Sequence, residues 1–304
     1  MYNVEFHADD YGISLNNSKR ILELVRDGHL DGFSIISNMS HYEECMKLLH
    51  DEWDSLPRKP LITVHINLID GLKLSGMNAA SEANQKNNIQ VNSWGKLFLG
   101  SYIPGPGRAI LRNQIYEEVK AQISRVYEDT KNLPGIDSAL RLDSHVHTHM
   151  IPIVFDAMMM AVKDLDLSGK LVYVRQSLEP MAMFMTTPGI RGTFPAVNLV
   201  KNVILRLLSH RTNRILSNLG IEHGLLWGLC MSGHMDAERM TLLMSRMEKY
   251  AKKRDAYIEI LGHPGIVLES EKLDEYGADD MIFFFSNDRN VEYDGMLQMC
   301  NRIQ

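Results

Sequence analysis

Two kinds of segment alternate along this chain, and their alternation is the strongest constraint on its fold. Short apolar runs rich in β-branched residues separate longer stretches in which apolar residues recur every three or four positions. The first pattern is typical of buried strands and the second of amphipathic helices. Seven or eight such units predict an α/β fold with a parallel sheet closed into a barrel. Strands are expected at residues 3–6, 32–37, 61–66, 139–143, 171–174, 225–231, 257–261 and, with the weakest pattern, 281–285.

Helices are expected between these strands. Residues 17–28 end at Gly28, a suitable C-cap residue, and residues 236–254 begin at Asp236, a suitable N-cap residue. Residues 112–127 carry apolar side chains at spacings of three and four. These periodicities place one apolar face of each helix against the sheet.

Two stretches interrupt this rhythm. Residues 70–107 are rich in Asn, Ser, Gly and Pro, and residues 176–220 mix Pro and Gly with basic residues. In a barrel, such insertions usually extend the loops around the active site. Neither an internal repeat nor a linker divides the sequence, so residues 1–304 are expected to form a single domain.

Composition narrows the class of protein. The 304 residues carry a net charge of −6 and are 45% hydrophobic, which gives no electrostatic reason to expect a nucleic acid or a membrane as partner. The cysteines Cys45, Cys230 and Cys300 form no CxxC pair, as suits a reducing compartment. The first residues lack the apolar stretch of a signal peptide. We therefore expect a cytoplasmic enzyme or small-molecule-binding protein.

Polar residues gather where the expected strands end. They are His7, Asp9 and Asp10 after the first strand, His65 and Asn67 after the third, Asp143, His145, His147 and His149 after the fourth, Arg175 after the fifth and His263 after the seventh. Because the C-terminal ends of barrel strands meet at one face, these side chains are expected to lie together. So many titratable groups are costly to bury and hard to explain by packing alone.

The histidine run at residues 145–149 gives the most specific chemical indication. A single histidine at a strand end is more often a hydrogen-bonded structural residue than a ligand. His145, His147 and His149 differ, because period two places all three on one face if the strand continues. Neutral imidazoles bind divalent cations, and Asp143 lies two residues upstream. The run therefore predicts a metal site.

Each of the other candidates has a second interpretation. Asp9 and Asp10 stand in an ordinary turn sequence, although two adjacent carboxylates could divide metal binding from proton transfer. His65 could equally be a buried structural histidine. Arg175 could lie on the surface or orient a carboxylate. His263 stands in a Gly-His-Pro-Gly corner in which the turn explains every residue except the histidine.

Taken together, four motifs resemble the YdjC-like carbohydrate deacetylases, a family that includes chitooligosaccharide deacetylases. The motifs are FHADDYG at residues 6–12, VHINL at 64–68, LDSHVHTHMIP at 142–152 and GHPG at 262–265. They occur in the family's order, and the resemblance covers residues 5–265, which is most of the chain. The resemblance implies an irregular TIM-like (β/α) barrel and removal of an N-acetyl group from an amino sugar. The stretches 70–107 and 176–220 show no match.

The resemblance also implies roles for individual residues. Asp10, His65 and His145 match the metal ligands, Asp9 the neighbouring catalytic base and His263 the acid. Arg175 is expected to hold Asp9, although its surroundings match only loosely. The remaining motif residues are expected to support the ligands or contact the sugar: His7, Asn67, Asp143, His147 and His149. His7 is a departure, because relatives usually carry asparagine there.

The expected cofactor is one divalent ion. Two histidines and a carboxylate suit zinc, but also cobalt, nickel, manganese or iron, or magnesium with waters completing its shell. His-x-His-x-His also fits amidohydrolase- and histidinol-phosphatase-type barrels, which hold two or three metals and usually open with a His-x-His pair on the first strand. A third alternative is a non-enzymatic sugar- or metal-binding protein. The expected partner is a small sugar whose identity the sequence leaves open, and relatives often form homodimers.

Overall fold

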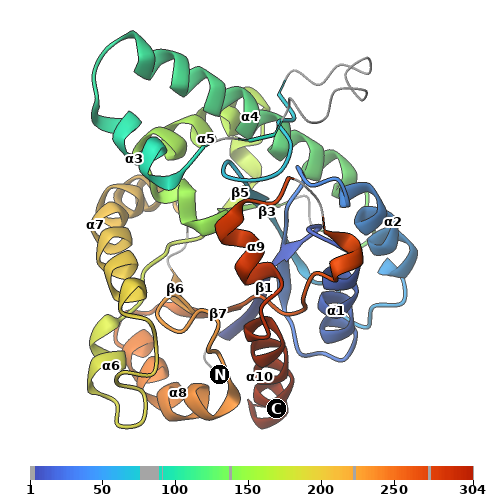
Figure 1. Cartoon of the computed structure of the whole chain (residues 1–304), viewed down its shortest axis with the longest axis vertical. Coiled ribbons are helices and arrows are strands. Elements are labelled where there is room, and N and C mark those ends of the chain that lie inside the picture. The colour runs from blue at the N-terminus through green and yellow to red at the C-terminus, as the bar shows by residue number, and fades with distance from the viewer. Residues whose placement is uncertain are drawn as a thin grey trace.

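A computed structural model describes residues 4–75, 89–90, 92–136, 139–221, 224–272 and 275–303. Seven parallel strands form one sheet in the order β5-β4-β3-β2-β1-β7-β6. The sheet curls and helices surround it, giving an α/β barrel-like fold (Figure 1). This architecture confirms the expected barrel-like α/β fold with parallel strands, although β5 and β6 at the two ends of the sheet do not pair with each other. The strands are β1 (Val4–Tyr11), β2 (Gly32–Ile35), β3 (Leu61–Ile66), β4 (Leu140–Ser144), β5 (Leu171–Val174), β6 (Gly224–Trp227) and β7 (Tyr257–Gly262).

The two ends of the sheet, β5 and β6, are joined by the segment that follows β5. The amide of Leu226 in β6 donates to the carbonyl of Leu178 at 3.1 Å. The buried carboxylate of Glu179 then accepts hydrogen bonds from the successive amides of residues 228–230, at 2.8–3.2 Å. A loop therefore completes the curl on this side, where a closed barrel would have strand pairing.

The three amphipathic stretches form helices where they were expected. The first is α1 (Leu15–Arg26), whose N-cap Ser14 accepts from the amide of Asn17, and Gly28 follows it with a φ of +79°. The third is α8 (Ala237–Lys252), capped by Asp236 as predicted. The other helices are α2 (Tyr42–Trp53), α3 (Trp94–Tyr102), α4 (Pro106–Thr130), α5 (Pro152–Asp164), α6 (Met181–Thr186), α7 (Ala196–Asn218), α9 (Ala278–Phe284) and α10 (Asp288–Ile303), with short 3-10 turns η2 (His145–Met150), η3 (Ser168–Lys170) and η4 (Glu269–Glu271).

The strand expected at residues 281–285 is wrong, because this segment ends the helix α9. On a strand, Ile282 and Phe284 would share a face. Here Ile282 is 75% exposed, whereas Phe284 is buried against the ring of Tyr276, with centroids 5.4 Å apart. The run of three phenylalanines resembled a strand only in composition. In Figure 1, α9 lies in front of the sheet, across one end of the curl.

The two interrupting stretches are less loop-like than expected. Much of 176–220 belongs to α6 and to α7, a helix of 23 residues that packs against η2. The second half of 70–107 holds α3, capped by Ser93, and the start of α4. Residues 76–88 and 91 lie outside the described part of the chain. Among the residues described, no helix combines the length and apolar character needed to span a bilayer.

Candidate metal centre

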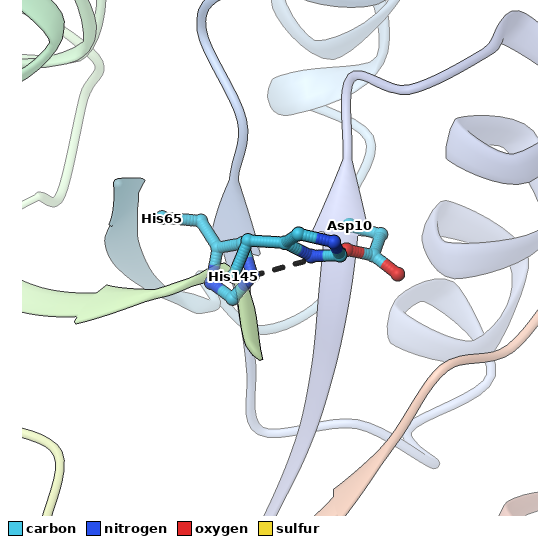
Figure 2. A group of neighbouring side chains, drawn as sticks. All are labelled: Asp10, His65 and His145. Atoms are coloured by element: carbon cyan, nitrogen blue, oxygen red, sulfur yellow. Dashed lines mark ion pairs between the residues drawn. The ribbon is translucent and has the colours of Figure 1, made fainter. Parts of the chain in front are cut away.

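Asp10, His65 and His145 converge at the C-terminal ends of their strands. Asp10 lies in β1 and His65 in β3, and His145 directly follows β4. One donor atom from each lies within 4.8 Å of the others, and all three side chains are buried. Figure 2 shows the three side chains turned toward one another. The structure therefore brings together the three residues expected to bind a metal.

Asp10 presents one oxygen to this cluster and anchors the other. Its Oδ2 accepts from Nη1 of the buried Arg289 at 2.9 Å. Its Oδ1 is buried, has no hydrogen-bond partner among the described residues, and lies 3.4 Å from Nδ1 of His145. Burial alone would raise the pKa of Asp10, but the neighbouring His145 and Arg289 hold it well below its ordinary value. Asp10 is thus an ionised carboxylate with one oxygen aimed at two imidazoles.

His65 is oriented by a second carboxylate. Its Nδ1 lies 2.6 Å from Oδ1 of Asp143, a hydrogen bond in which the ring must donate because the carboxylate can only accept. Nε2 therefore faces the cluster, 3.8 Å from both Asp10 Oδ1 and Asp9 Oδ2. Burial by itself lowers the pKa of His65, but Asp143 and Asp9 raise it above its ordinary value. A cation bound at Nε2 of His65 would take the place of the proton that Asp143 and Asp9 favour on this ring.

His145 reaches the cluster from a tight turn, and here one expectation is wrong. β4 ends at Ser144, and the histidine run forms η2 instead of continuing the strand. Val146 and His147 adopt left-handed φ values of 45° and 56°, so the period-two argument for a shared face fails. His145 alone turns to Asp10. Its ring packs 6.1 Å from that of Phe284 in α9, measured between centroids.

The other two histidines of the run point elsewhere. His149 bonds to Ser144 Oγ at 2.6 Å through Nδ1 and to the carbonyl of Arg175 at 2.8 Å through Nε2. Burial lowers the pKa of His149 to about 4. His147 faces Ser177 Oγ at 2.9 Å, and burial lowers its pKa well below its ordinary value. Both rings are neutral and support the turn that carries His145.

The donor set fits a divalent cation. Two imidazole nitrogens and a carboxylate oxygen with no other partner are the ligands of mononuclear zinc sites with open positions. Burying an ionised oxygen without a hydrogen bond is costly, and a cation would offset that cost. The same donors also accept other first-row divalent metals, so the set does not select the ion.

Asp9 lies beside this cluster and is clamped by Arg175. The two carboxylate oxygens accept from Nη1 and Nη2 of Arg175, each at 2.8 Å. Arg175 is fully buried and also contacts Asp143 at 2.8 Å and Glu259 at 2.6 Å. Burial would raise the pKa of Asp9, but the charge of Arg175 lowers it. The predicted pairing of Arg175 with Asp9 is thus present, with Oδ2 of Asp9 3.8 Å from His65.

A second group of possible donors, His7, Asp9 and Asp143, also lies within 4.8 Å. Arg175 already occupies the position between these donors, because its Nη1 bridges Asp9 and Asp143 at 2.8 Å each. Both ring nitrogens of His7 are also engaged, by Glu5 and Ser34 at 2.8 Å each. A guanidinium between two carboxylates repels a cation, so this group is an ion-pair network.

His263 and Asn67 complete the predicted residues. Nδ1 of His263 lies 3.0 Å from Oε2 of Glu292 in α10, and the same oxygen accepts from the His263 amide at 2.6 Å. The His263 side chain is 16% exposed, more than any proposed ligand. Asn67 is buried, and its Oδ1 accepts from the amides of Ile69 and Asp70. Asn67 therefore shapes the loop after β3.

Sequence reasoning missed the contributions of α9 and α10. Arg289 and Glu292 lie one turn apart on α10 and hold Asp10 and His263. Phe284 in α9 packs against His145. Outside these helices, Oδ2 of Asp70 in the loop after β3 lies 3.8 Å from Nε2 of His145. The spacing of Arg289 and Glu292 on one helix face was visible in the sequence, but nothing in it indicated that this face meets β1, almost 280 residues earlier.

Comparison with known proteins shows the family and the fold of this chain. A family model described as YdjC-like protein matches residues 3–299. Among solved structures, a protein of Enterococcus faecalis V583 provisionally assigned to cellobiose-phosphate cleavage aligns with a TM-score of 0.58 at 12% identity, covering 98% of this chain and 92% of its own. At that identity the likeness shows a shared fold. No curated protein matches the sequence. Since the family model spans nearly the whole chain, this chain belongs to the YdjC-like protein family.

Proposed function

We propose that this protein is a metal-dependent hydrolase that removes the N-acetyl group from an acetylated amino sugar and releases acetate. The observation that carries the proposal is the division of labour between two adjacent carboxylates. Asp10 aims an oxygen without a hydrogen-bond partner among the described residues at two imidazoles, whereas Asp9 is held by Arg175 beside the same cluster. Hydrolysis at a single metal needs one group that binds the ion and another that accepts a proton.

Asp10, His65 and His145 would hold the ion. A divalent cation held there supplies Lewis-acid polarisation of a carbonyl and a lowered pKa for water. Asp9 accepts the proton of the attacking water at a carboxylate oxygen. Arg175 keeps that carboxylate oriented and ionised until the transfer, because both of its terminal nitrogens donate to it. The water oxygen bonds to the acetyl carbon, and the carbon–nitrogen bond then breaks.

The departing amine needs a proton, and we assign its donation to His263. Glu292 accepts at Nδ1 of His263, so Nε2 remains for the substrate. After transfer from Nε2, the products are acetate and the free amino sugar, which balances the water consumed. Glu292 would thus orient the acid His263, as Arg175 orients the base Asp9.

The alternatives draw less support from the site. Multi-metal barrels need a second set of open donors, and the nearest group, His7, Asp9 and Asp143, is bridged by Arg175. A protein that only binds sugar or metal has no need of Asp9 clamped beside the cluster. The comparison with the E. faecalis protein shows the fold and does not bear on the bond that is cleaved.

Acetate release tests the proposal directly. The zinc-loaded protein should release acetate from at least one member of a panel of N-acetylglucosamine oligomers and nucleotide-linked N-acetyl sugars. Asp9→Asn should abolish turnover while keeping the metal, and the exposed Asp54→Asn should match the wild type. Undiminished turnover in Asp9→Asn would refute the role of Asp9. Binding of a sugar without acetate release would favour the non-enzymatic alternative.

A further inference from the structure

A continuous chain of hydrogen bonds runs from the interior of the curl to the candidate metal centre. Glu5 Oε1 faces Nδ1 of His7 at 2.8 Å, and Nε2 of His7 faces Oγ of Ser34 at 2.8 Å. Ser34 donates to Oδ2 of Asp143 at 2.5 Å, and Oδ1 of Asp143 faces His65 at 2.6 Å. His7 and Ser34 are fully buried. Neither residue is a proposed metal ligand, but Ser34 is two hydrogen bonds from the ligand His65 and His7 is three.

The direction of each bond follows from what each group can donate. Asp143 faces Nη1 of Arg175 at 2.8 Å through Oδ2 and His65 through Oδ1, so this carboxylate accepts from each of them and from Ser34. Ser34 has a single hydroxyl proton and gives it to Asp143. Its oxygen must then accept from His7, which requires a proton on Nε2.

The hydrogen bond between His7 and Glu5 is assigned in the same way. Burial alone would raise the pKa of Glu5, but His7 and Arg141 lower it to about 2, so Glu5 is a carboxylate at neutral pH. Arg141 donates to the same oxygen at 2.6 Å. Glu5 therefore accepts from Nδ1 of His7. His7 is thus held between an oxygen of Glu5 on one side and an oxygen of Ser34 on the other.

From this geometry we propose that His7 and Ser34 are positioning residues for the metal ligand His65. They hold Oδ2 of Asp143 so that Oδ1 stays on Nδ1 of His65, which leaves Nε2 directed at the ion. The carboxylate contact to His65 is the familiar support of a metal-bound histidine. The extension through Ser34 to His7 ties this support to Glu5, the neighbour of His7 in β1. The proposal rests on the metal centre of the proposed function.

Two serines of the same segment provide a matched test. Ser34→Ala removes the hydroxyl that donates to Asp143. Ser37→Ala removes a hydroxyl three residues later that is equally buried and has no hydrogen-bond partner among the described residues. The measurement is Zn²⁺ affinity by competition with a chelator. Loss of an outer support typically weakens metal binding by about 10- to 100-fold, which is expected for Ser34→Ala. Ser37→Ala should stay within about twofold of the wild type.

Substitutions at His7 separate positioning from packing. His7→Gln keeps a donor where Nε2 stood and should retain most of the Zn²⁺ affinity. His7→Leu fills similar space without a donor and should lose affinity as Ser34→Ala does. If Ser34→Ala fails to fold, the two His7 variants decide, and if His7→Leu fails to fold, the two serine variants decide.

The outcomes separate this proposal from the proposed function. A wild type that binds no Zn²⁺ contradicts the metal centre itself. A wild type that binds Zn²⁺ while Ser34→Ala and Ser37→Ala bind it equally well contradicts only the positioning role.

Discussion

Arg175 is the residue on which the buried charges of the site most depend. Its guanidinium contacts Asp9, Asp143 and Glu259, and all four side chains are almost fully buried. Removing one partner of a buried ion pair costs about 3–5 kcal/mol, because the remaining charge is left uncompensated. Arg175→Met keeps much of the side-chain volume but removes the charge from three carboxylates. We therefore expect a loss of at least about 3 kcal/mol in the free energy of unfolding at pH 7.

Urea denaturation measures this loss, and pH provides an internal check. In Arg175→Met, the burial of Asp9 is no longer offset by the guanidinium, so its folded-state pKa should rise above the unfolded value. A carboxyl group with a raised folded-state pKa favours the folded state as pH falls. The deficit should therefore shrink between pH 7 and pH 5. The exposed Arg191→Met is the control. A deficit below about 1 kcal/mol, or one no larger than in the control, would refute the reasoning.

Two further predictions follow from the same contacts. Burial lowers the pKa of His149 from 6.5 to about 4, so the unfolded chain binds a proton there at a higher pH than the folded chain does. The free energy of unfolding should therefore fall by up to about 3 kcal/mol as the pH drops from 6.5 to 4. Urea titrations of the wild type should show this slope and His149→Gln should flatten it, whereas identical slopes would contradict the assignment. Glu292→Gln should lower kcat for acetate release by about 10- to 100-fold, within the usual contribution of acid catalysis, while Zn²⁺ content stays unchanged; an unaltered kcat would remove Glu292 from the support of His263.

Much of the scaffold was predictable because buried parallel strands have a strong local signal. Seven of the eight expected strands are present, since their apolar runs are short and bounded by turn residues. The failure at residues 281–285 arose because a phenylalanine run has the composition of a strand and the packing of a helix. In 176–220, prolines and glycines at the ends of α7 masked the helix between them.

The site was predictable to the extent that barrel topology brings strand ends together. That rule brought these strand-end side chains together, whereas the choice of Asp10, His65 and His145 as ligands came from the resemblance to the YdjC-like family. The contact of Arg175 with Asp9 was a separate hypothesis about the mechanism. The rule could not foresee the turn in η2, because Val146 is a β-branched residue in a left-handed conformation that local preference disfavours. Nor could it foresee Arg289 and Glu292, whose contacts depend on how α10 packs against β1 and β7.

Metal stoichiometry tests the central claim most directly. Protein purified without chelator, reloaded with Zn²⁺ and freed of excess should contain about one ion per chain by elemental analysis, as a site with two histidines and one carboxylate requires. Asp9→Asn should retain that ion and His145→Ala should lose it. Two or more ions per chain, or a full complement in His145→Ala, would contradict a single centre held by Asp10, His65 and His145.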